Sequence, residues 1–189
     1  MDRDIIYRPA LKPDSIALAR LASIASSGVA EYAWTQLARP GEDIFDIARQ
    51  RYEREGTQIS YQHCTVAEAN YSLIAMFLAW PEIGEAETET DPVLGPLVNL
   101  REEESYYIDC IAVFEDYRGQ GIGSELMRLA EQQADEKGLN KTSLIVFEDN
   151  SNAGRLYERL GYKEVSRVAT VPHELIHYTG DAILMVKTL

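Results

Sequence analysis

An arginine and several closely spaced glycines form the stretch of the chain whose chemistry is easiest to interpret. Arg118 is followed by Gly119, Gly121 and Gly123 in a chain of 189 residues. Glycine allows a ligand to approach the backbone closely, and N–H groups at the start of a helix carry partial positive charge. With a guanidinium beside them, such N–H groups favour a phosphate or a pyrophosphate. The spacing therefore predicts an anion-binding turn, in preference to glycines that serve only chain reversal.

The segments on either side of this turn indicate a strand and a helix. Residues 106–114 are aromatic, β-branched or small and apolar, interrupted only by Asp109, which is typical of a central strand covered on both faces. After the turn, a helix is expected from near Gly121 to near Lys137, with Gly138 as its terminator. The apolar residues that recur there at helical spacing are Ile122, Leu126, Leu129, Ala130 and Ala134.

Two other phosphate-binding patterns fit this turn less well. A P-loop needs a lysine after its second glycine, and no lysine of the chain follows a glycine in that pattern. The dinucleotide fingerprint needs a third glycine where the chain has Ser124, and the charged residues 115–118 separate the turn from the strand. Glu148 ends the next expected strand, where an acid could bind a ribose, so a dinucleotide-dependent oxidoreductase stays as a weaker alternative.

The strand, turn and helix together resemble the signature of the GNAT superfamily of N-acetyltransferases. The family pattern Arg/Gln-x-x-Gly-x-Gly/Ala is met at every defined position by Arg118-Gly119-Gln120-Gly121-Ile122-Gly123. A second family feature follows in order: a strand at residues 143–147, then Asn150-Ser-Asn-Ala153, Leu156-Tyr157-Glu158 and Leu160-Gly-Tyr162. The resemblance is strong over residues 105–165 and rests on general layout elsewhere.

The resemblance implies an N-acetyltransferase that uses acetyl-CoA. The acetyl group would pass to a primary amine of a small molecule, protein or peptide by direct attack in a ternary complex. The central strand's backbone would bind the acyl carbonyl and the pantetheine amides, and the turn would bind the pyrophosphate. Asn150 matches the asparagine that holds the cofactor arm, although it could be only a helix cap, and Asn152 could share or take over either job. The residues implied in cofactor binding are Ile111, Ala112, Val113, Arg118, Gly119, Gln120, Gly121, Ile122, Gly123, Ser124, Asn150, Asn152 and Tyr157.

Three side chains are candidates for the chemistry itself. Tyr157 occupies the position where the family commonly has a tyrosine facing the sulfur, and a phenol with a pKa of about 10 can give a proton to a thiolate. The alternative for Tyr157 is a ring packed between helix and sheet. Glu104 and Asp109 are the candidates for the base that accepts the amine proton. Glutamates beside a strand are commonly only surface residues, and an aspartate buried without a partner is costly.

The rest of the pattern predicts an α/β fold in one domain, residues 1–189, with six or seven strands. The resemblance adds a GNAT-like mixed, mostly antiparallel sheet flanked by helices, with central strands splayed around the pantetheine arm. Further strands are expected at residues 5–8, 58–66, 71–80, 163–171 and 182–187, with a hairpin turn at 67–70. Helices are expected around residues 17–25, 31–37 and 43–55. Residues 81–96 are expected to form a loop whose acidic part, 82–91, is either a lid or a solvated insertion.

Composition argues against several other classes of protein. The formal charge of −13 disfavours nucleic-acid binding and is compatible with a cationic amine acceptor. The longest apolar run, residues 73–80, is far shorter than the roughly 20 residues of a membrane span, so we expect a soluble cytoplasmic protein without a membrane partner. Cys64 and Cys110 lack ligand spacing, which predicts buried reduced thiols and no metal site.

A third functional hypothesis is a non-catalytic acyl-CoA-binding protein that responds to its ligand through an interaction partner. Such a protein would bind CoA and acetylate no amine, and the presence of Tyr157 favours catalysis over this reading. The sequence leaves the identity of the acceptor amine open. It also leaves the oligomeric state open, a homodimer included.

Overall fold

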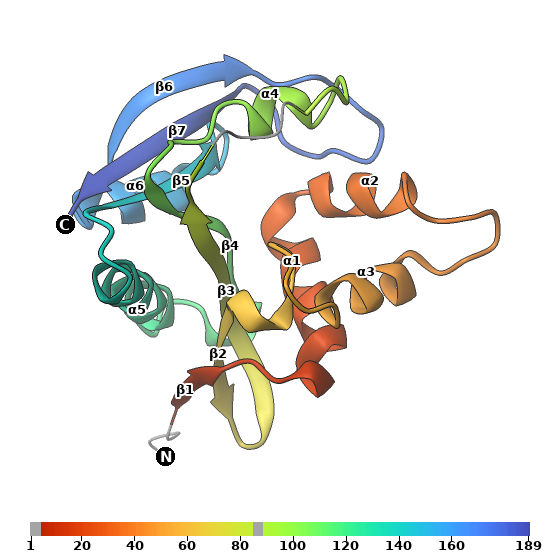
Figure 1. Cartoon of the computed structure of the whole chain (residues 1–189), viewed down its shortest axis with the longest axis horizontal. Coiled ribbons are helices and arrows are strands. Elements are labelled where there is room, and N and C mark those ends of the chain that lie inside the picture. The colour runs from red at the N-terminus through yellow and green to blue at the C-terminus, as the bar shows by residue number, and fades with distance from the viewer. Residues whose placement is uncertain (1–4, 85–88) are drawn as a thin grey trace. The chain divides into compact units, whose positions relative to one another are not determined.

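The structure of the chain, a computed structural model, describes residues 5–84 and 89–189. The strands form one seven-stranded sheet in the order β1-β2-β3-β4-β5-β7-β6, with β4 in the middle (Figure 1). The β4–β5 pair is parallel, whereas β1–β2, β2–β3, β5–β7 and β6–β7 are antiparallel. The predicted mixed, mostly antiparallel α/β sheet is therefore confirmed. The strands are β1 (Ile6–Pro9), β2 (Cys64–Ala69), β3 (Ser72–Glu82), β4 (Ser105–Val113), β5 (Lys141–Phe147), β6 (Lys163–Ala169) and β7 (Asp181–Thr188).

Six α-helices and three short 3₁₀ helices lie between the described strands. The α-helices are α1 (Ser15–Ser26), α2 (Val29–Thr35), α3 (Ile44–Tyr52), α4 (Gly95–Val98), α5 (Ile122–Glu136) and α6 (Ser151–Arg159). The 3₁₀ helices are η1 (Lys12–Asp14), η2 (Tyr61–His63) and η3 (Glu115–Tyr117). Contacts divide the chain into two compact units. The first comprises Met1–Ala79 and Cys110–Leu126, and the second comprises Trp80–Asp109 and Met127–Leu189.

In the first unit, α1, α2 and α3 pack on one another (Figure 1). Leu18 and Leu21 on α1 are fully buried, as their helical spacing requires. Helix α1 ends at Ser26. Ser27 and Gly28 follow with left-handed φ values of 49° and 98°, and Gly28 serves as the N-cap of α2. Gly28 thus occupies the C′ position, directly after the C-cap Ser27, where a left-handed glycine commonly terminates a helix.

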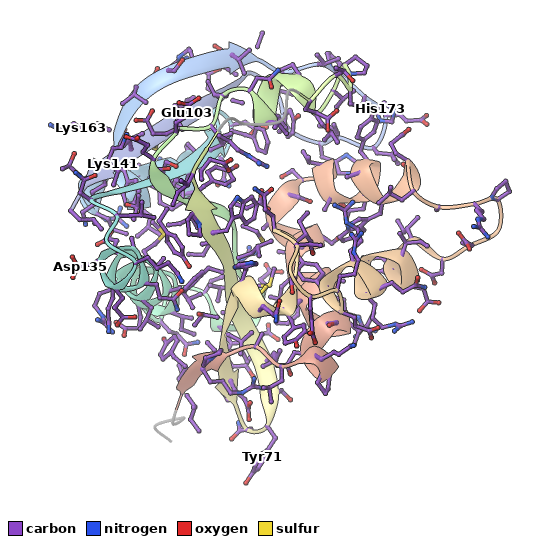
Figure 2. The ribbon with its side chains drawn as sticks, in the orientation of Figure 1. Tyr71, Glu103, Asp135, Lys141, Lys163 and His173 are labelled. Atoms are coloured by element: carbon purple, nitrogen blue, oxygen red, sulfur yellow. The ribbon has the colours of Figure 1, made fainter. Side chains whose placement is uncertain are left out.

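Two predictions about the β2–β3 hairpin are wrong. Residues 58–63 do not extend β2, because the Ser60 hydroxyl donates to the Arg54 carbonyl (2.5 Å) and accepts from the Gln62 N–H (3.2 Å), which starts η2 instead. The turn does not fall at residues 67–70, most of which belong to β2. It is made by Asn70 and Tyr71, with φ of 51° and 62°, the left-handed pair that a tight two-residue hairpin needs. Tyr71 is 99% exposed at the tip (Figure 2).

In the second unit, the β4–β5 register runs from Tyr106↔Thr142 to Ile108↔Leu144, and each strand continues beyond it. This short parallel register agrees with central strands that splay. The unit's last strand in sheet order, β6, is exposed at nearly every residue and carries an irregular register with β7 between Glu164 and Ser166. It forms one edge of the sheet.

The segment predicted as a loop over residues 81–96 is only partly a loop. Pro81 and Glu82 complete β3, and residues 95–98 form α4, to which Asp91 contributes by accepting the N–H groups of Val93 and Leu94 (2.8 Å each). Residues 85–88, at the centre of the acidic stretch, lie outside the described residues. Within the described ranges, every helix is too short or too polar to cross a membrane.

Candidate active site

The turn between β4 and α5, in the first unit, is shaped by its charged residues as well as by glycine. Residues 115–117 form η3, and the Arg118 N–H then donates to the Glu115 carbonyl (3.1 Å). The exposed Arg118 side chain turns back, so that its Nε–H donates to the Val113 carbonyl at the end of β4 (3.0 Å). The charged insert that separates strand from glycines is thus a tight turn that places a guanidinium beside the end of β4.

Two of the glycines have a backbone conformation that other residues rarely adopt. Gly119 and Gly121 have φ of 73° and 80°, and a Cβ atom on either would meet no atom within 4 Å. The requirement for glycine is therefore conformational, and the space above the backbone is open. The Gln120 side chain is used within the turn, where its amide donates to the Asp116 carbonyl (3.3 Å).

The start of α5 presents N–H groups beside this open backbone. The Glu125 N–H donates to the Gly121 carbonyl (3.0 Å), which closes the first turn of the helix. The N–H groups of Ile122, Gly123 and Ser124 precede that bond and have no acceptor within the helix. The predicted helix from near Gly121 to near Lys137 is confirmed by its bounds. Its first turn, the left-handed glycines and Arg118 have the chemistry that a pyrophosphate needs.

The end of β4 adds backbone groups in the same unit. Ile111 and Val113 point to one face of the strand and are partly exposed, while Ala112 points to the other face and is buried. The paired part of β4 with β5 ends at Ile108, before these three residues. An extended segment of this kind can pair its backbone with amide groups of a linear ligand.

Asparagines at the start of α6, in the second unit, are both engaged locally. The Asn150 side-chain oxygen accepts the Ala153 N–H (3.3 Å), so this residue is the N-cap of α6. A cap of this type uses the oxygen of the amide and not its NH2 group. The Asn152 oxygen accepts from the Arg155 guanidinium (2.6 Å). Asn150 therefore caps α6 through its side-chain oxygen, and its NH2 group is the part suited to a ligand.

Tyr157 is the buried aromatic residue of α6, with 6% of its surface exposed. Its ring lies 6.1 Å from that of Tyr162, inclined by 58°. Tyr162 is itself fixed by a hydrogen bond with the Thr142 hydroxyl (2.8 Å), and burial raises the pKa of its phenol. Packing thus fixes the position of the Tyr157 ring. A fixed ring agrees with the alternative that Tyr157 only packs between helix and sheet, and a precisely placed proton donor requires it as well.

The two candidate bases occupy different places. Glu104 is exposed just before β4, has a left-handed φ of 53°, and its N–H donates to the Glu82 carbonyl (2.8 Å). Asp109 lies within β4, and its Oδ1 is 3.6 Å from Nη2 of Arg101. Five residues of extended chain span about 17 Å, so the two carboxylates cannot serve the same atom of a substrate. Asp109 is the nearer of the two to residues 111–113.

Sequence reasoning missed the surroundings of Asp109. The Arg101 guanidinium lies over the rings of Trp80 and Tyr107 and near the Glu82 carboxylate. Burial acts to lower the Arg101 pKa, but nearby Tyr107, Asp109 and Glu82 raise it above its usual value. Burial also raises the Tyr107 pKa. These residues come from β3, β4 and the connection after α4, and no local pattern links them.

A hollow of about 450 Å³ lies in the second unit, beside α6. The residues that α6 contributes include Ser151, Gly154, Arg155 and Glu158, and the lining does not include Tyr157. Glu148 lines it too and is paired with Arg167 on β6 (3.3 Å). The acid that supported the dinucleotide alternative therefore has an ion-pair partner within the protein.

Comparison with known proteins gives one consistent family. The model of the acetyltransferase (GNAT) family matches residues 29–162. The uncharacterized N-acetyltransferase YycN of Bacillus subtilis is 34% identical over 67 residues, which is 35% of this chain and 42% of that protein. The thialysine N-epsilon-acetyltransferase of Bos taurus is 37% identical over 60 residues, 32% of this chain and 35% of that protein. The chain thus spans less than half the length of these two relatives.

Solved structures share the fold over nearly the whole chain. A structure described as an acetyltransferase superposes with a TM-score of 0.69 at 22% identity, covering 97% of this chain and 98% of the other. A GNAT acetyltransferase from Elizabethkingia anophelis with acetyl-CoA bound has a TM-score of 0.60 at 18% identity, and both chains are covered completely. At these identities the likeness shows the fold alone.

Proposed function

The chain belongs to the GNAT family of acetyltransferases, and from this premise we propose that it transfers an acetyl group from acetyl-CoA to a primary amine. The observation that carries the proposal is the turn from Arg118 to Ser124. Its left-handed Gly119 and Gly121, its open backbone and the N–H groups at the start of α5, which have no acceptor within the helix, fit a pyrophosphate.

We assign the cofactor to the residues that the family resemblance implies for it. Arg118 and the N–H groups from Gly119 to Ser124 bind the pyrophosphate, and the backbone of Ile111, Ala112 and Val113 pairs with the pantetheine amides. The Asn150 NH2 group, with Asn152 beside it, holds the cofactor arm. When bound, acetyl-CoA supplies an acetyl group that is activated as a thioester.

The protein's own groups then serve three needs of acetyl transfer. A backbone N–H near Ile111–Val113 donates to the acyl oxygen as negative charge develops there. The Tyr157 hydroxyl holds a proton for the departing sulfur, a role that a phenol can serve. Asp109 accepts the proton of the attacking amine, in a ternary complex with both substrates.

Asp109 is preferred to Glu104 as the base because of strand geometry. Side chains two residues apart point to the same face of a strand, so Asp109 and Ile111 share a face of β4 about 7 Å apart. Glu104 precedes the strand by one residue and is about 17 Å from Asp109 in extended chain. It is the second candidate, and would act through water.

A cationic acceptor is the substrate class that the charge supports. The chain carries a net charge of −13. Two relatives are named for acetylation of thialysine and of ornithine, and both names describe amino acids with a second amine. We propose a small cationic amine of this kind, with a peptide N-terminus as the other candidate. A cytoplasmic location stays a prediction.

The test is amine-dependent release of CoA. The protein is mixed with acetyl-CoA and a panel that includes thialysine, ornithine, a polyamine and a peptide with a free N-terminus, and thiol release is followed with a chromogenic disulfide. Release with at least one amine, together with mass-spectrometric detection of its acetylated product, supports the proposal. Tight CoA binding by calorimetry with no release across the panel would instead support the non-catalytic alternative.

A further inference from the structure

Arg101 is a cation held between two aromatic rings in the second unit. Its guanidinium carbon lies 5.2 Å from the centre of the Trp80 ring and 4.6 Å from that of the Tyr107 ring. The two rings are 5.4 Å apart and inclined by 66° to each other. Both rings are buried, and 17% of the Arg101 side chain is exposed. A planar cation packed in this way has little freedom to move.

Two carboxylates flank the guanidinium at ion-pair distances. Nη1 of Arg101 is 3.7 Å from Glu82 Oε2, and Nη2 is 3.6 Å from Asp109 Oδ1. Glu82 is fixed independently, because its Oε2 accepts the Trp80 indole N–H (3.0 Å). The Asp109 side chain is the more exposed of the two, at 28% against 11% for Glu82. The cluster therefore has a fixed, buried carboxylate, a fixed cation and a second carboxylate that is more exposed.

We propose that Arg101 is a positioning residue that holds the partly exposed Asp109 carboxylate on the face of β4 that it shares with Tyr107, where it receives the proton of the acceptor amine. This inference rests on the proposed function, which assigns the proton to Asp109. Arg101 touches neither substrate in this role. It acts by attracting one oxygen of Asp109 while Trp80 and Tyr107 keep the guanidinium in place.

The charge balance explains why a cation is needed there. Without Arg101, Glu82 and Asp109 would be two like charges on neighbouring strands, and the more exposed carboxylate would turn away toward water. A reacting group displaced by about 1 Å can cost roughly 100-fold in rate. We therefore expect Arg101→Gln to lower kcat by about 10- to 100-fold. The KM for acetyl-CoA should stay within about twofold, because Arg101 lies outside the residues assigned to the cofactor.

A double-mutant cycle tests whether Arg101 acts through Asp109. Arg101→Gln, Asp109→Asn and the double variant are compared in the CoA-release assay, with whichever of thialysine and ornithine the wild type turns over. If the inference is right, Arg101→Gln has almost no further effect once Asp109 is asparagine. Arg167→Gln is the matched control, since Arg167 also pairs with carboxylates, Glu148 and Glu164, but on the exposed strand β6. Its effect should be small in both backgrounds.

Further variants separate positioning from folding. Arg101→Lys keeps the charge and should recover part of the lost kcat. The pair Glu82→Gln with Arg101→Gln removes both buried charges together, which favours folding. Asp109 then lacks its cation but is no longer repelled by Glu82, so kcat should stay below the wild-type value and fall less than in Arg101→Gln alone. Each variant is checked by thermal unfolding.

The outcomes distinguish the inference from the proposed function. Losses that multiply in the double variant, or wild-type kcat in a folded Arg101→Gln variant, overturn the positioning role and leave the acetyltransferase intact. Wild-type kcat in Asp109→Asn overturns the role of both residues, and Glu104 then becomes the base to examine. A wild-type protein that releases no CoA with any amine overturns the proposed function, and the positioning role with it.

Discussion

Substitution of glycine by alanine should lower the free energy of unfolding at Gly121 and raise it at Gly154. Gly121 has a left-handed φ of 80° in the proposed pyrophosphate turn, whereas Gly154 lies within helix α6. A Cβ at either position would meet no atom within 4 Å, so steric clash with neighbours plays no part at either site. The backbone conformation alone should decide the sign of the effect.

The magnitudes follow from that difference. An alanine at Gly121 must adopt a left-handed conformation that costs about 1–2 kcal/mol, only partly offset by the smaller entropy of the unfolded chain. We expect Gly121→Ala to lower the free energy of unfolding by about 1 kcal/mol. Gly154→Ala should raise it by about 1 kcal/mol, the usual difference between the two residues in a helix interior. In a chain of this size each change corresponds to about 2–4 °C in Tm.

Urea unfolding followed by circular dichroism measures both variants under identical conditions, and Gly121→Asn serves as a further control. Asparagine tolerates the left-handed region better than alanine, so it should be the milder change at Gly121. Wild-type stability of Gly121→Ala would contradict a conformational requirement for glycine at this position. A shift of both alanine variants in the same direction would contradict it equally.

Three other expectations concern binding, transfer and pH. Gly121→Glu should abolish acetyl-CoA binding in calorimetry, because it places bulk and negative charge against the pyrophosphate. The control Gly56→Glu, at another open left-handed glycine, should bind acetyl-CoA normally. Normal binding by Gly121→Glu would contradict the phosphate assignment. Tyr157→Phe should keep the wild-type Kd for acetyl-CoA and lose roughly 10²–10⁴-fold in kcat, and an unchanged kcat would remove Tyr157 as the acid. Burial raises the Tyr162 pKa above its usual 10.0, so the unfolded chain releases that proton first as pH rises. Urea unfolding should therefore show a free energy of unfolding that falls above pH 10, by up to about 1.4 kcal/mol per pH unit for this group. Tyr162→Phe should make that fall shallower.

The pattern of neighbouring residues was sufficient to predict the secondary structure at the centre of the chain. The strand that became β4, the glycine turn and the helix α5 each have a periodicity or a backbone requirement that neighbouring residues decide. The position of β4 in the middle of the sheet also followed from its apolar residues, since only a strand covered on both faces has that composition. The family resemblance over residues 105–165 then supplied the assignments that periodicity could not.

The wrong predictions concern residues 58–63 and the turn of the β2–β3 hairpin. In both places a side-chain hydrogen bond or a backbone conformation competes with strand propensity. Nothing in the strand-like composition of residues 58–63 reveals that the Ser60 hydroxyl bonds to the Arg54 carbonyl and starts a 3₁₀ helix. Tyr71 is an aromatic residue that favours strands, yet it occupies a left-handed turn position. Such choices depend on hydrogen bonds and turn geometry that composition does not encode.

The cluster around Arg101 was beyond sequence reasoning for a different reason. Its members Trp80, Glu82, Arg101, Tyr107 and Asp109 are brought together by strand pairing and by the connection through α4. Taken singly, each has an ordinary explanation, such as a core aromatic or a surface charge. Only their distances show that one cation serves two carboxylates.

Strand β6 lies at one edge of the sheet, and this position affects how the protein can associate with other molecules. An exposed margin normally offers a row of unsatisfied N–H and C=O groups to which a foreign strand can attach. Here the irregularity between Glu164 and Ser166 interrupts that row, and charged side chains such as Lys163 and Arg167 lie along it. Self-association by continuous sheet extension is therefore discouraged at this margin, and a homodimer would need to form through another surface.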